Sequence, residues 1–350
     1  MSVRRHPPTL RTLFTWLPLA AVMISPALAA PPAWPPLIAG QTTSVRPVIS
    51  SVALSPDGTQ LVTAGDDHLV RTWSLVTGEH LQTLRGHRDW VRSACFTPDG
   101  QTIISGGNDK RLISWSLASG SQQELPAPGF AVARLAISPA GDRLAVAGFA
   151  DRVLVYDVPQ RTILQRLVTG CPDMRAISFS ADGKQLAAAG RDGRILLWDL
   201  ASGELLADPR WHGRRVRDLV FSPDGSTIYS VAEDRTLHAW NLLDVDRGFT
   251  LTLGPGKAMA IALCGPKHVA TAGSDNQIRI WDIEGRRLET VLRGHTGSVA
   301  TLAAGKNRLI SAGFDTTVRS WNIQPGESRP ILSAQRQPPE ADERQTGGNR

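Results

Sequence analysis

The 350-residue chain contains only three cysteines, Cys95, Cys171 and Cys264. An odd number of cysteines cannot all pair within one chain, and these three fall in three different units of the repeat described below. We therefore expect buried free thiols rather than a disulfide framework. A chain of this length can bury enough apolar surface to fold without disulfides or structural metals.

The usual short signatures of catalysis and metal binding are also missing. No CxxC, HExxH or GxSxG string is present. Gly256-Lys257 resembles the end of a phosphate-binding loop motif. Ala258, however, stands where that motif requires a Ser or Thr, which favours an ordinary turn. We expect no metal and no cofactor, because the histidines outside the repeat pattern show no ligand spacing. These histidines are His6, His68, His80, His238 and His268.

No apolar run is long enough to span a bilayer, which takes about 20 residues. The longest candidate is a largely apolar run of about a dozen residues, Leu13 to Ile24, preceded by three arginines and followed by Ala27-Leu28-Ala29. This arrangement is typical of a secretory signal peptide over residues 1–29. An uncleaved anchor is the alternative. The signal predicts a periplasmic or secreted protein with no membrane span after cleavage.

The excess of positive charge is small. The formal net charge is +6, and residues 1–29 hold three arginines and no acidic residue, which leaves +3 for the mature chain. Such a surplus gives no argument for nucleic-acid binding.

A repeat of 40 to 42 residues runs through the chain. Its anchor is an aromatic residue followed by a polar or acidic one. Ahead of most anchors lie a tight turn such as Pro56-Asp57-Gly58 and two short β patterns, with no sustained helical period. Four short strands per unit predict an all-β protein, a seven-bladed β-propeller of four-stranded antiparallel blades. The anchors begin at Trp73, Trp115, Tyr156, Trp198, Trp240, Trp281 and Trp321.

These repeats resemble the WD-repeat β-propeller family over about residues 46–323. In that family a hydrogen-bonded His, Ser or Thr, Asp and Trp brace each blade. The resemblance implies structural roles for these groups, whereas a hydrolase triad needs an exposed nucleophile and an oxyanion hole. Three repeats carry complete sets: His87, Ser105, Asp109 and Trp115; His212, Ser230, Asp234 and Trp240; and His295, Ser311, Asp315 and Trp321.

The other repeats depart from the full set to different degrees. The third departs most, with Val146, Ala150 and Tyr156 at three of the positions, so we expect its blade to be the least rigidly braced. Partial sets occur as Thr63, Asp67 and Trp73, as Thr271, Asp275 and Trp281, and as Asp192 with Trp198.

A closed ring needs an outer strand for its last blade, and in this family that strand often comes from the opposite terminus. The candidates are Pro36 to Thr42 and Arg329 to Ala334, and the register of Leu37 to Ala39 favours the first. The end of the chain is polar and free of large apolar residues, which predicts disorder. The expected boundaries are 1–29 (signal peptide), 30–45 (N-terminal segment, a candidate closing strand), 46–334 (propeller) and 335–350 (disordered tail).

The resemblance also implies a docking face, formed by the loops that lead into the inner strands and the turns before the bracing Asp. Residues 210–217 are the densest charged segment, and Trp and Arg dominate interface hot spots. A solvated basic edge with Trp90 and Trp211 packed between blades is the alternative. The candidate partner-binding residues are Arg88, Trp90, Arg92, Arg175, Arg191, Trp211, Arg214, Arg215, Arg217 and Phe314.

The sequence therefore predicts a non-catalytic protein-interaction scaffold of the bacterial envelope, a monomer or a subunit of a hetero-complex. Two alternatives stay open. Recognition of an anionic glycan or envelope polymer predicts salt-dependent binding without any other protein. An enzyme or cofactor-binding propeller with a central-channel site predicts a bound metal or chromophore in purified material.

Overall fold

The computed structural model describes residues 47–323 and the backbone of residues 37–38. The predicted signal peptide 1–29, the predicted tail 335–350 and the closing candidate 329–334 lie outside the described residues.

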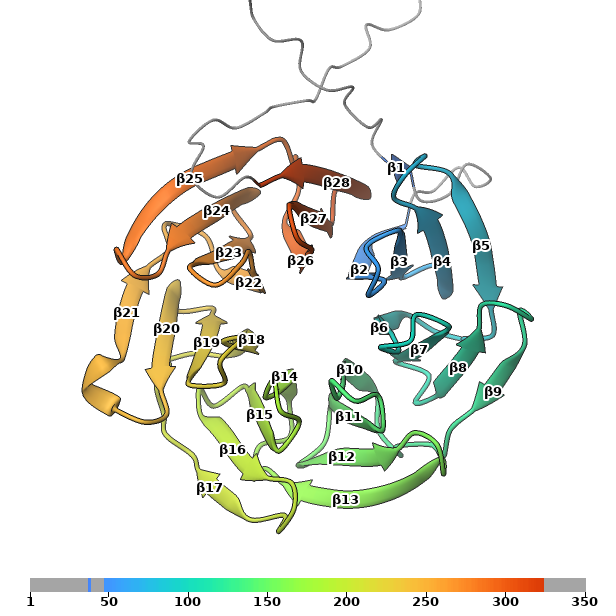
Figure 1. The fold of residues 1–350 in the computed structure, drawn as a ribbon, viewed down its shortest axis with the longest axis horizontal. Coiled ribbons are helices and arrows are strands. Elements are labelled where there is room, and N and C mark those ends of the chain that lie inside the picture. The colour runs from blue at the N-terminus through green and yellow to red at the C-terminus, as the bar shows by residue number, and fades with distance from the viewer. Residues whose placement is uncertain (1–36, 39–46, 324–350) are drawn as a thin grey trace, which may run out of the picture. The chain divides into compact units, whose positions relative to one another are not determined.

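Seven four-stranded antiparallel sheets are arranged around a common axis, and within each blade the strands follow one another from the axis outward (Figure 1). This confirms the prediction of an all-β, seven-bladed propeller. The first four blades are blade 1, β2 (Ile49–Leu54), β3 (Gln60–Gly65), β4 (Leu69–Ser74) and β5 (His80–Arg85); blade 2, β6 (Val91–Phe96), β7 (Thr102–Gly107), β8 (Leu112–Ser116) and β9 (Gln122–Glu124); blade 3, β10 (Val132–Ile137), β11 (Arg143–Gly148), β12 (Arg152–Asp157) and β13 (Thr162–Val168); and blade 4, β14 (Met174–Phe179), β15 (Gln185–Gly190), β16 (Ile195–Asp199) and β17 (Leu205–Ala207).

The remaining blades repeat this order, with one short 3-10 helix, η1 (Val245–Arg247), ahead of the outer strand of blade 5. In the described part of the chain, no helix is long and apolar enough to cross a membrane. The strands are blade 5, β18 (Val216–Phe221), β19 (Thr227–Ala232), β20 (Thr236–Asn241) and β21 (Phe249–Thr252); blade 6, β22 (Ala258–Leu263), β23 (His268–Gly273), β24 (Gln277–Asp282) and β25 (Arg287–Arg293); and blade 7, β26 (Val299–Ala304), β27 (Arg308–Gly313) and β28 (Thr317–Asn322).

The outer strand of blade 7 comes from the N-terminal side of the chain. Strand β1 (Leu37–Ile38) pairs antiparallel with β28, with Leu37 opposite Val318 and Ile38 opposite Thr317. A segment from the start of the chain thus completes a sheet built from its end. The pairing covers the outer edge of β28 at Thr317 and Val318, which shortens the open template for edge-to-edge association.

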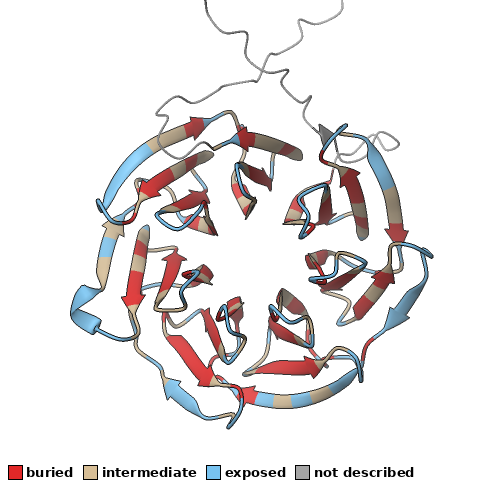
Figure 2. Cartoon of the chain, in the orientation of Figure 1, coloured by how far each residue is buried: buried red, intermediate tan, exposed pale blue. Residues whose placement is uncertain are grey.

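The second strand of every blade is the most deeply buried, whereas the outer strands are largely exposed (Figure 2). In β15, five of the six residues are buried, because neighbouring blades cover both of its faces. The hydrophobic clusters join adjacent blades: Trp240 of blade 5 packs with Ala187 and Leu197 of blade 4. A single blade therefore cannot bury its own apolar surface, and the ring is the folding unit.

The recurring Pro-Asp-Gly turns join the first and second strands. In blade 1, Asp57 Oδ1 accepts hydrogen bonds from Ser55 Oγ at 2.6 Å and from the Thr59 backbone nitrogen at 3.0 Å. Gly58 follows with φ of +72°, a left-handed conformation that glycine adopts without steric cost. The same arrangement around Asp99, Asp182 and Asp224 fixes strand register in three further blades.

Polar side chains also link successive inner strands around the axis. Each accepts a hydrogen bond from a backbone N–H of the next blade, which would otherwise lack a partner. The links are Ser51 to Ala94 (3.1 Å), Ser93 to Leu135 (3.1 Å), Asp218 to Ile261 (3.2 Å) and Thr301 to Val52 (3.3 Å).

Candidate functional site

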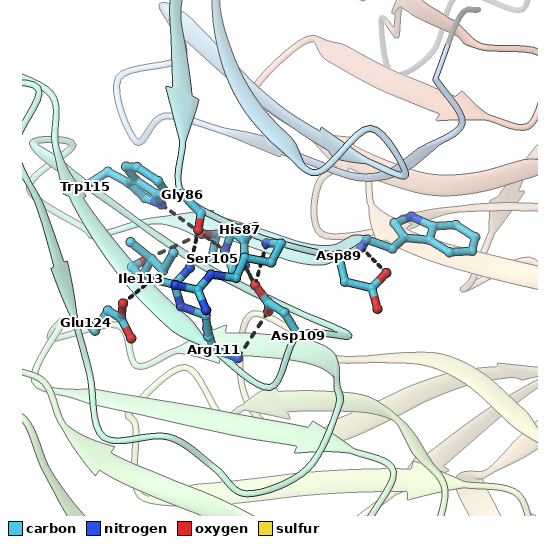
Figure 3. A network of polar contacts seen from close by, with 11 residues as sticks. Gly86, His87, Asp89, Ser105, Asp109, Arg111, Ile113, Trp115 and Glu124 are labelled. Atoms are coloured by element: carbon cyan, nitrogen blue, oxygen red, sulfur yellow. Dashed lines mark hydrogen bonds and ion pairs between the residues drawn. The ribbon is translucent and has the colours of Figure 1, made fainter.

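The polar set of blade 2 forms one directed chain of hydrogen bonds (Figure 3). Trp115 Nε1 donates to Ser105 Oγ at 2.8 Å, and Ser105 Oγ lies 2.8 Å from His87 Nε2. His87 Nδ1 lies 2.9 Å from Asp109 Oδ2, which also accepts from the Arg88 backbone nitrogen at 3.0 Å. A neutral imidazole satisfies every member of this chain: it accepts from the serine and donates to the aspartate.

The electrostatics of this set agree with a neutral histidine. Burial lowers the pKa of His87, and the carboxylate of Asp109 offsets this only in part. Every buried donor in the chain meets an acceptor, which avoids a penalty of about 1–3 kcal/mol for each unsatisfied group.

Blade 7 repeats the chain completely. His295 Nδ1 lies 2.7 Å from Asp315 Oδ2 and its Nε2 lies 2.7 Å from Ser311 Oγ, to which Trp321 Nε1 donates at 2.7 Å. Burial by itself raises the pKa of Asp315, but the hydrogen bond from His295 and those from its other donors outweigh burial and hold it well below its usual range.

Blade 5 forms only part of the chain. His212 Nε2 lies 2.8 Å from Ser230 Oγ and its Nδ1 lies 3.1 Å from Asp234 Oδ2. Within the described residues, Trp240 makes no hydrogen bond to Ser230. The His212 ring instead meets His238 edge-on, with ring centroids 5.1 Å apart. Burial and the neighbouring His212 lower the pKa of His238 to about 4.

Blades 1 and 6 lack the histidine, and an arginine takes its place beside the aspartate. In blade 1, Trp73 Nε1 donates to Thr63 Oγ1 at 2.9 Å, while Asp67 pairs with Arg71 at 2.6 Å. The corresponding distances in blade 6 are 2.8 Å for the tryptophan and threonine, and 2.6 Å for Asp275 and Arg279. Sequence reasoning missed this replacement, although an arginine four residues after the aspartate was visible in both repeats.

In blades 3 and 4, the polar groups at the bracing positions have other partners. The Tyr156 hydroxyl donates to the Pro126 carbonyl at 2.9 Å, and burial raises the pKa of Tyr156 to about 12. In blade 4, Asp192 pairs with Arg194 at 2.8 Å rather than with a histidine. That blade 3 is the least rigidly braced stays a prediction.

The chemistry available to these sets is limited by their burial. Ser105, Ser230 and Ser311 are completely buried, so no substrate atom can reach their hydroxyls. Among the residues described, no group of three or more His, Cys, Asp or Glu is placed to hold a metal ion. The arrangement supports bracing of the blades, as the resemblance implies.

The cysteines are free and carry no reactive signature. Cys171 and Cys264 are buried and Cys95 is partly buried. Burial raises the pKa of both Cys95 and Cys264 to about 12, so neither forms the thiolate that nucleophilic chemistry needs.

A second polar cluster lies at one mouth of the ring, where the inner strands begin. The register of every inner strand shifts at its second residue, and such a bulge re-aims the side chain of the extra residue. All seven second residues line one cavity of about 90 Å³, together with Val48, Trp90, Arg134 and Phe314. We call this cavity the arginine mouth, because three of the seven are arginines: Ser50, Arg92, Ala133, Arg175, Arg217, Met259 and Ala300.

Positive charge exceeds negative charge around the arginine mouth. Two carboxylates are shared among four cations, and each carboxylate touches more than one of them. The pairs are Asp173 with Arg175 and with Arg215 (3.0 Å), and Glu233 with Arg215 (3.3 Å), Arg217 (3.4 Å) and Lys257 (3.5 Å).

Arg92 adds a further cation without a carboxylate of its own. Its guanidinium carbon lies 3.6 Å from the centroid of the Trp90 ring, and its Nε donates to Asn108 Oδ1 at 3.0 Å. In the described part of the chain, no carboxylate lies within ion-pairing distance of Arg92. Burial lowers the pKa of Arg92, and the nearby Arg175 lowers it further.

An ion pair on the wall of the channel was not foreseen from the sequence. Arg134 of β10 reaches Asp218 of β18, with nitrogen–oxygen distances of 2.7 and 2.8 Å. The two residues occupy equivalent positions in blades 3 and 5, and Ala176 holds that position in blade 4 between them. The small alanine side chain leaves room for the guanidinium to pass. Asp218 is buried, which raises its pKa, and Arg134 opposes this effect.

The other predicted partner-binding residues divide into two groups. Arg88, Arg191 and Arg214 are exposed in loops on the face that bears the arginine mouth. Trp211 does not lie with these exposed arginines. It packs against the hydrophobic cluster of blades 4 and 5, and its ring centroid lies 5.3 Å from that of His238. This placement agrees with the alternative interpretation, in which Trp211 is packed between blades. Sequence reasoning missed Phe149, which is exposed and lies 4.3 Å from the Arg175 guanidinium.

The opposite mouth is apolar. Its cavity of about 560 Å³ is lined mainly by the ends of the inner strands and the turns that follow, including Phe96, Pro98, Phe179 and Phe221. The two ends of the channel therefore differ sharply in charge.

Comparison with known proteins matches the chain to the family model described as "WD domain, G-beta repeat". The six matched segments cover more than half of the chain and leave out residues 117–163, where most of blade 3 lies. A similar relative is the "Probable serine/threonine-protein kinase PkwA" of Thermomonospora curvata, 44% identical over 43 residues. The match covers 12% of this chain and 6% of that protein. The matched segments are 39–74, 78–116, 164–199, 203–241, 259–282 and 286–322.

Proposed function

Because the chain belongs to the WD40-repeat family, we propose that it is a scaffold that captures a partner protein on the face bearing the arginine mouth. WD40 propellers generally serve as protein-interaction platforms and are typically non-catalytic. The observation that carries the proposal is the surplus of arginine over carboxylate on one face of a rigid ring. The complementary partner presents an acidic surface.

The rim of this face offers the side chains that binding interfaces favour. Arg88, Arg191 and Arg214 are exposed, and Phe314, which lines the arginine mouth, is 48% exposed. Arginine and aromatic residues are enriched at the centres of protein interfaces, where a few contacts supply most of the binding energy. None of these side chains is needed inside a blade, so they are available to a partner.

We place this activity in the periplasm or outside the cell. The support is the charged start, apolar run and small residues of positions 1–29. Cell fractionation and the mass of the purified chain test it. We expect an envelope or secreted protein that starts near Ala30, and a full-length cytoplasmic protein would contradict the assignment.

The capture experiment uses envelope extract and three forms of the mature protein. These are the wild type, a rim variant with Arg88, Arg191 and Arg214 changed to Glu, and a control variant with Lys184, Lys267 and Lys306 changed to Glu. The control lysines are exposed in the turns between first and second strands, on the opposite face.

We expect the wild type and the control to capture the same partner and the rim variant to lose it at least tenfold. Equal recovery by all three forms would remove this face from the proposal. A third outcome is that no protein is captured and the purified protein alone binds an anionic glycan in a salt-sensitive way. That result would favour an envelope polymer over a protein as the ligand.

A further inference from the structure

The arginine mouth differs from the rim around it, because its cations are recessed and point into one small cavity. Arg92, Arg175 and Arg217 come from blades 2, 4 and 5, and each is the extra residue of a bulge. All three are partly buried and line the same cavity of about 90 Å³. That volume is several times what one water needs, so a compact group fits and a folded segment does not.

The charges at this cavity are not balanced by the chain itself. Arg92 has no carboxylate within ion-pairing distance among the described residues, although Asp89 attracts it from farther away. Arg175 and Arg217 share their carboxylates with Arg215 and Lys257. Burial lowers the pKa of Arg217, and Arg175 lowers it further, so the guanidinium groups repel one another. Like charges held together in a recess are unfavourable unless an anion joins them.

Two buried donors beside the cavity point to the same conclusion. Trp90 Nε1 and Arg215 Nε are buried and have no hydrogen-bond acceptor among the described residues. Trp90 lines the cavity, and Arg215 pairs with Asp173 and Glu233, the carboxylates that also pair with Arg175 and Arg217. Groups of this kind are rare in folded proteins. Both atoms are shielded from solvent, so they add to the unmatched donors around the cavity without themselves reaching a ligand in it.

We propose that the arginine mouth binds a multivalent oxyanion of the phosphate class, either free or carried by a small phosphomonoester. Three planar guanidinium groups from three blades can each engage a different oxygen of a tetrahedral anion. A monocarboxylate offers only two oxygens and one charge to the same three groups. This inference does not rest on the proposed function, because it needs no partner protein.

Calorimetric titration of the mature protein tests the proposal with three ligands: inorganic phosphate, O-phosphoserine and acetate. We expect saturable one-to-one binding of phosphate, with acetate at least tenfold weaker. Phosphoserine that binds as tightly as phosphate identifies a phosphomonoester, and phosphoserine that is excluded identifies the free ion. Both results support the site, whereas heats that stay unsaturated up to about 10 mM phosphate would overturn it.

Two single variants locate the binding. Arg92→Gln and Arg217→Gln should each weaken phosphate at least tenfold, while Lys184→Gln on the opposite face should leave the affinity unchanged. Thermal unfolding provides a second readout, since a bound ligand raises the unfolding temperature of the wild type but not of the mouth variants. Unchanged phosphate affinity in both mouth variants would contradict the proposal. If the rim variant loses partner capture but still binds phosphate, the phosphate site is distinct from the docking surface.

Discussion

The braced blades and the arginine mouth are both clusters of polar side chains at equivalent positions of a repeat, yet they are built in opposite ways. In blade 2, each donor of the chain from Trp115 to Asp109 meets an acceptor within the chain. At the mouth, Arg92 has no carboxylate within ion-pairing distance and Trp90 Nε1 has no acceptor in the described part of the chain.

This difference separates architecture from function. A closed network stabilises the fold, and removing one member exposes the others to the full penalty of an unsatisfied buried group. An open cluster of like charges destabilises the fold slightly. Proteins retain such a cluster where a bound ligand supplies the missing opposite charge. Variants in the blades should therefore reduce stability, and variants at the mouth should reduce binding.

The largest effect is expected for Asp315→Ala in blade 7. The carboxylate accepts from His295 at 2.7 Å and from the backbone nitrogens of Thr296 and Thr317 at 3.1 Å each. Its removal leaves the buried His295 and the partly buried Thr317 nitrogen without an acceptor, so the free energy of unfolding should fall by about 3 kcal/mol or more. Denaturant titration measures the change. Asp89→Ala, at an exposed position, is the control, and equal small effects for both would refute the bracing role.

A smaller loss is expected for Ser105→Ala in blade 2. The hydroxyl accepts from Trp115 Nε1 and lies 2.8 Å from His87 Nε2, so both would lose a partner. We expect a decrease in unfolding free energy of about 1–3 kcal/mol. Ser119→Ala, which alters an exposed serine, should change it by less than about 0.5 kcal/mol. A Ser105→Ala protein as stable as this control would argue against the directed chain.

Acid should weaken the blades before their aspartates titrate. The pKa values of His87 and His238 in the folded protein lie below the ordinary 6.5, and that of His238 is about 4. The unfolded chain therefore binds more protons, so this stability is present above pH 6.5 and is lost as the pH falls toward 4. The unfolding temperature, measured from pH 7 to pH 4, should fall by several degrees. A flat profile over this window would contradict the neutral, buried histidines.

The smallest loss is expected in blade 3, where one hydrogen bond replaces the network. Tyr156→Phe removes only the bond to the Pro126 carbonyl, so the unfolding free energy should fall by about 1 kcal/mol. A loss as large as that of Asp315→Ala would show that blade 3 is braced as firmly as the others. Amide hydrogen exchange in β12 and β8 checks the same comparison independently.

The sequence was sufficient for the repeat and the fold because its period, turns and anchors recur in near-constant register. It also placed Arg92, Arg175 and Arg217 among the candidates for binding. It did not separate them from Arg88, Arg191 and Arg214 on the rim, since that distinction depends on the bulge in each inner strand. Bulges shift register without leaving a pattern in single residues.

The ion pair between Arg134 and Asp218 could not be predicted from the sequence for a related reason. The two residues lie two blades apart, and their contact depends on a small side chain at Ala176 in the intervening blade. Neither residue carries a pattern in the sequence that marks it as a partner of the other, and only the closed ring brings them together.

The central claim, that the arginine mouth serves binding and not the fold, is tested most directly by the stability of one triple variant. Changing Arg92, Arg175 and Arg217 to Gln leaves Asp173 paired with Arg215, and Glu233 paired with Arg215 and Lys257. Asp173 and Glu233 each keep a partner, and the repulsion among the three guanidinium groups of the mouth disappears. The free energy of unfolding in phosphate-free buffer should equal or exceed that of the wild type. A loss comparable to that of Asp315→Ala would contradict the account.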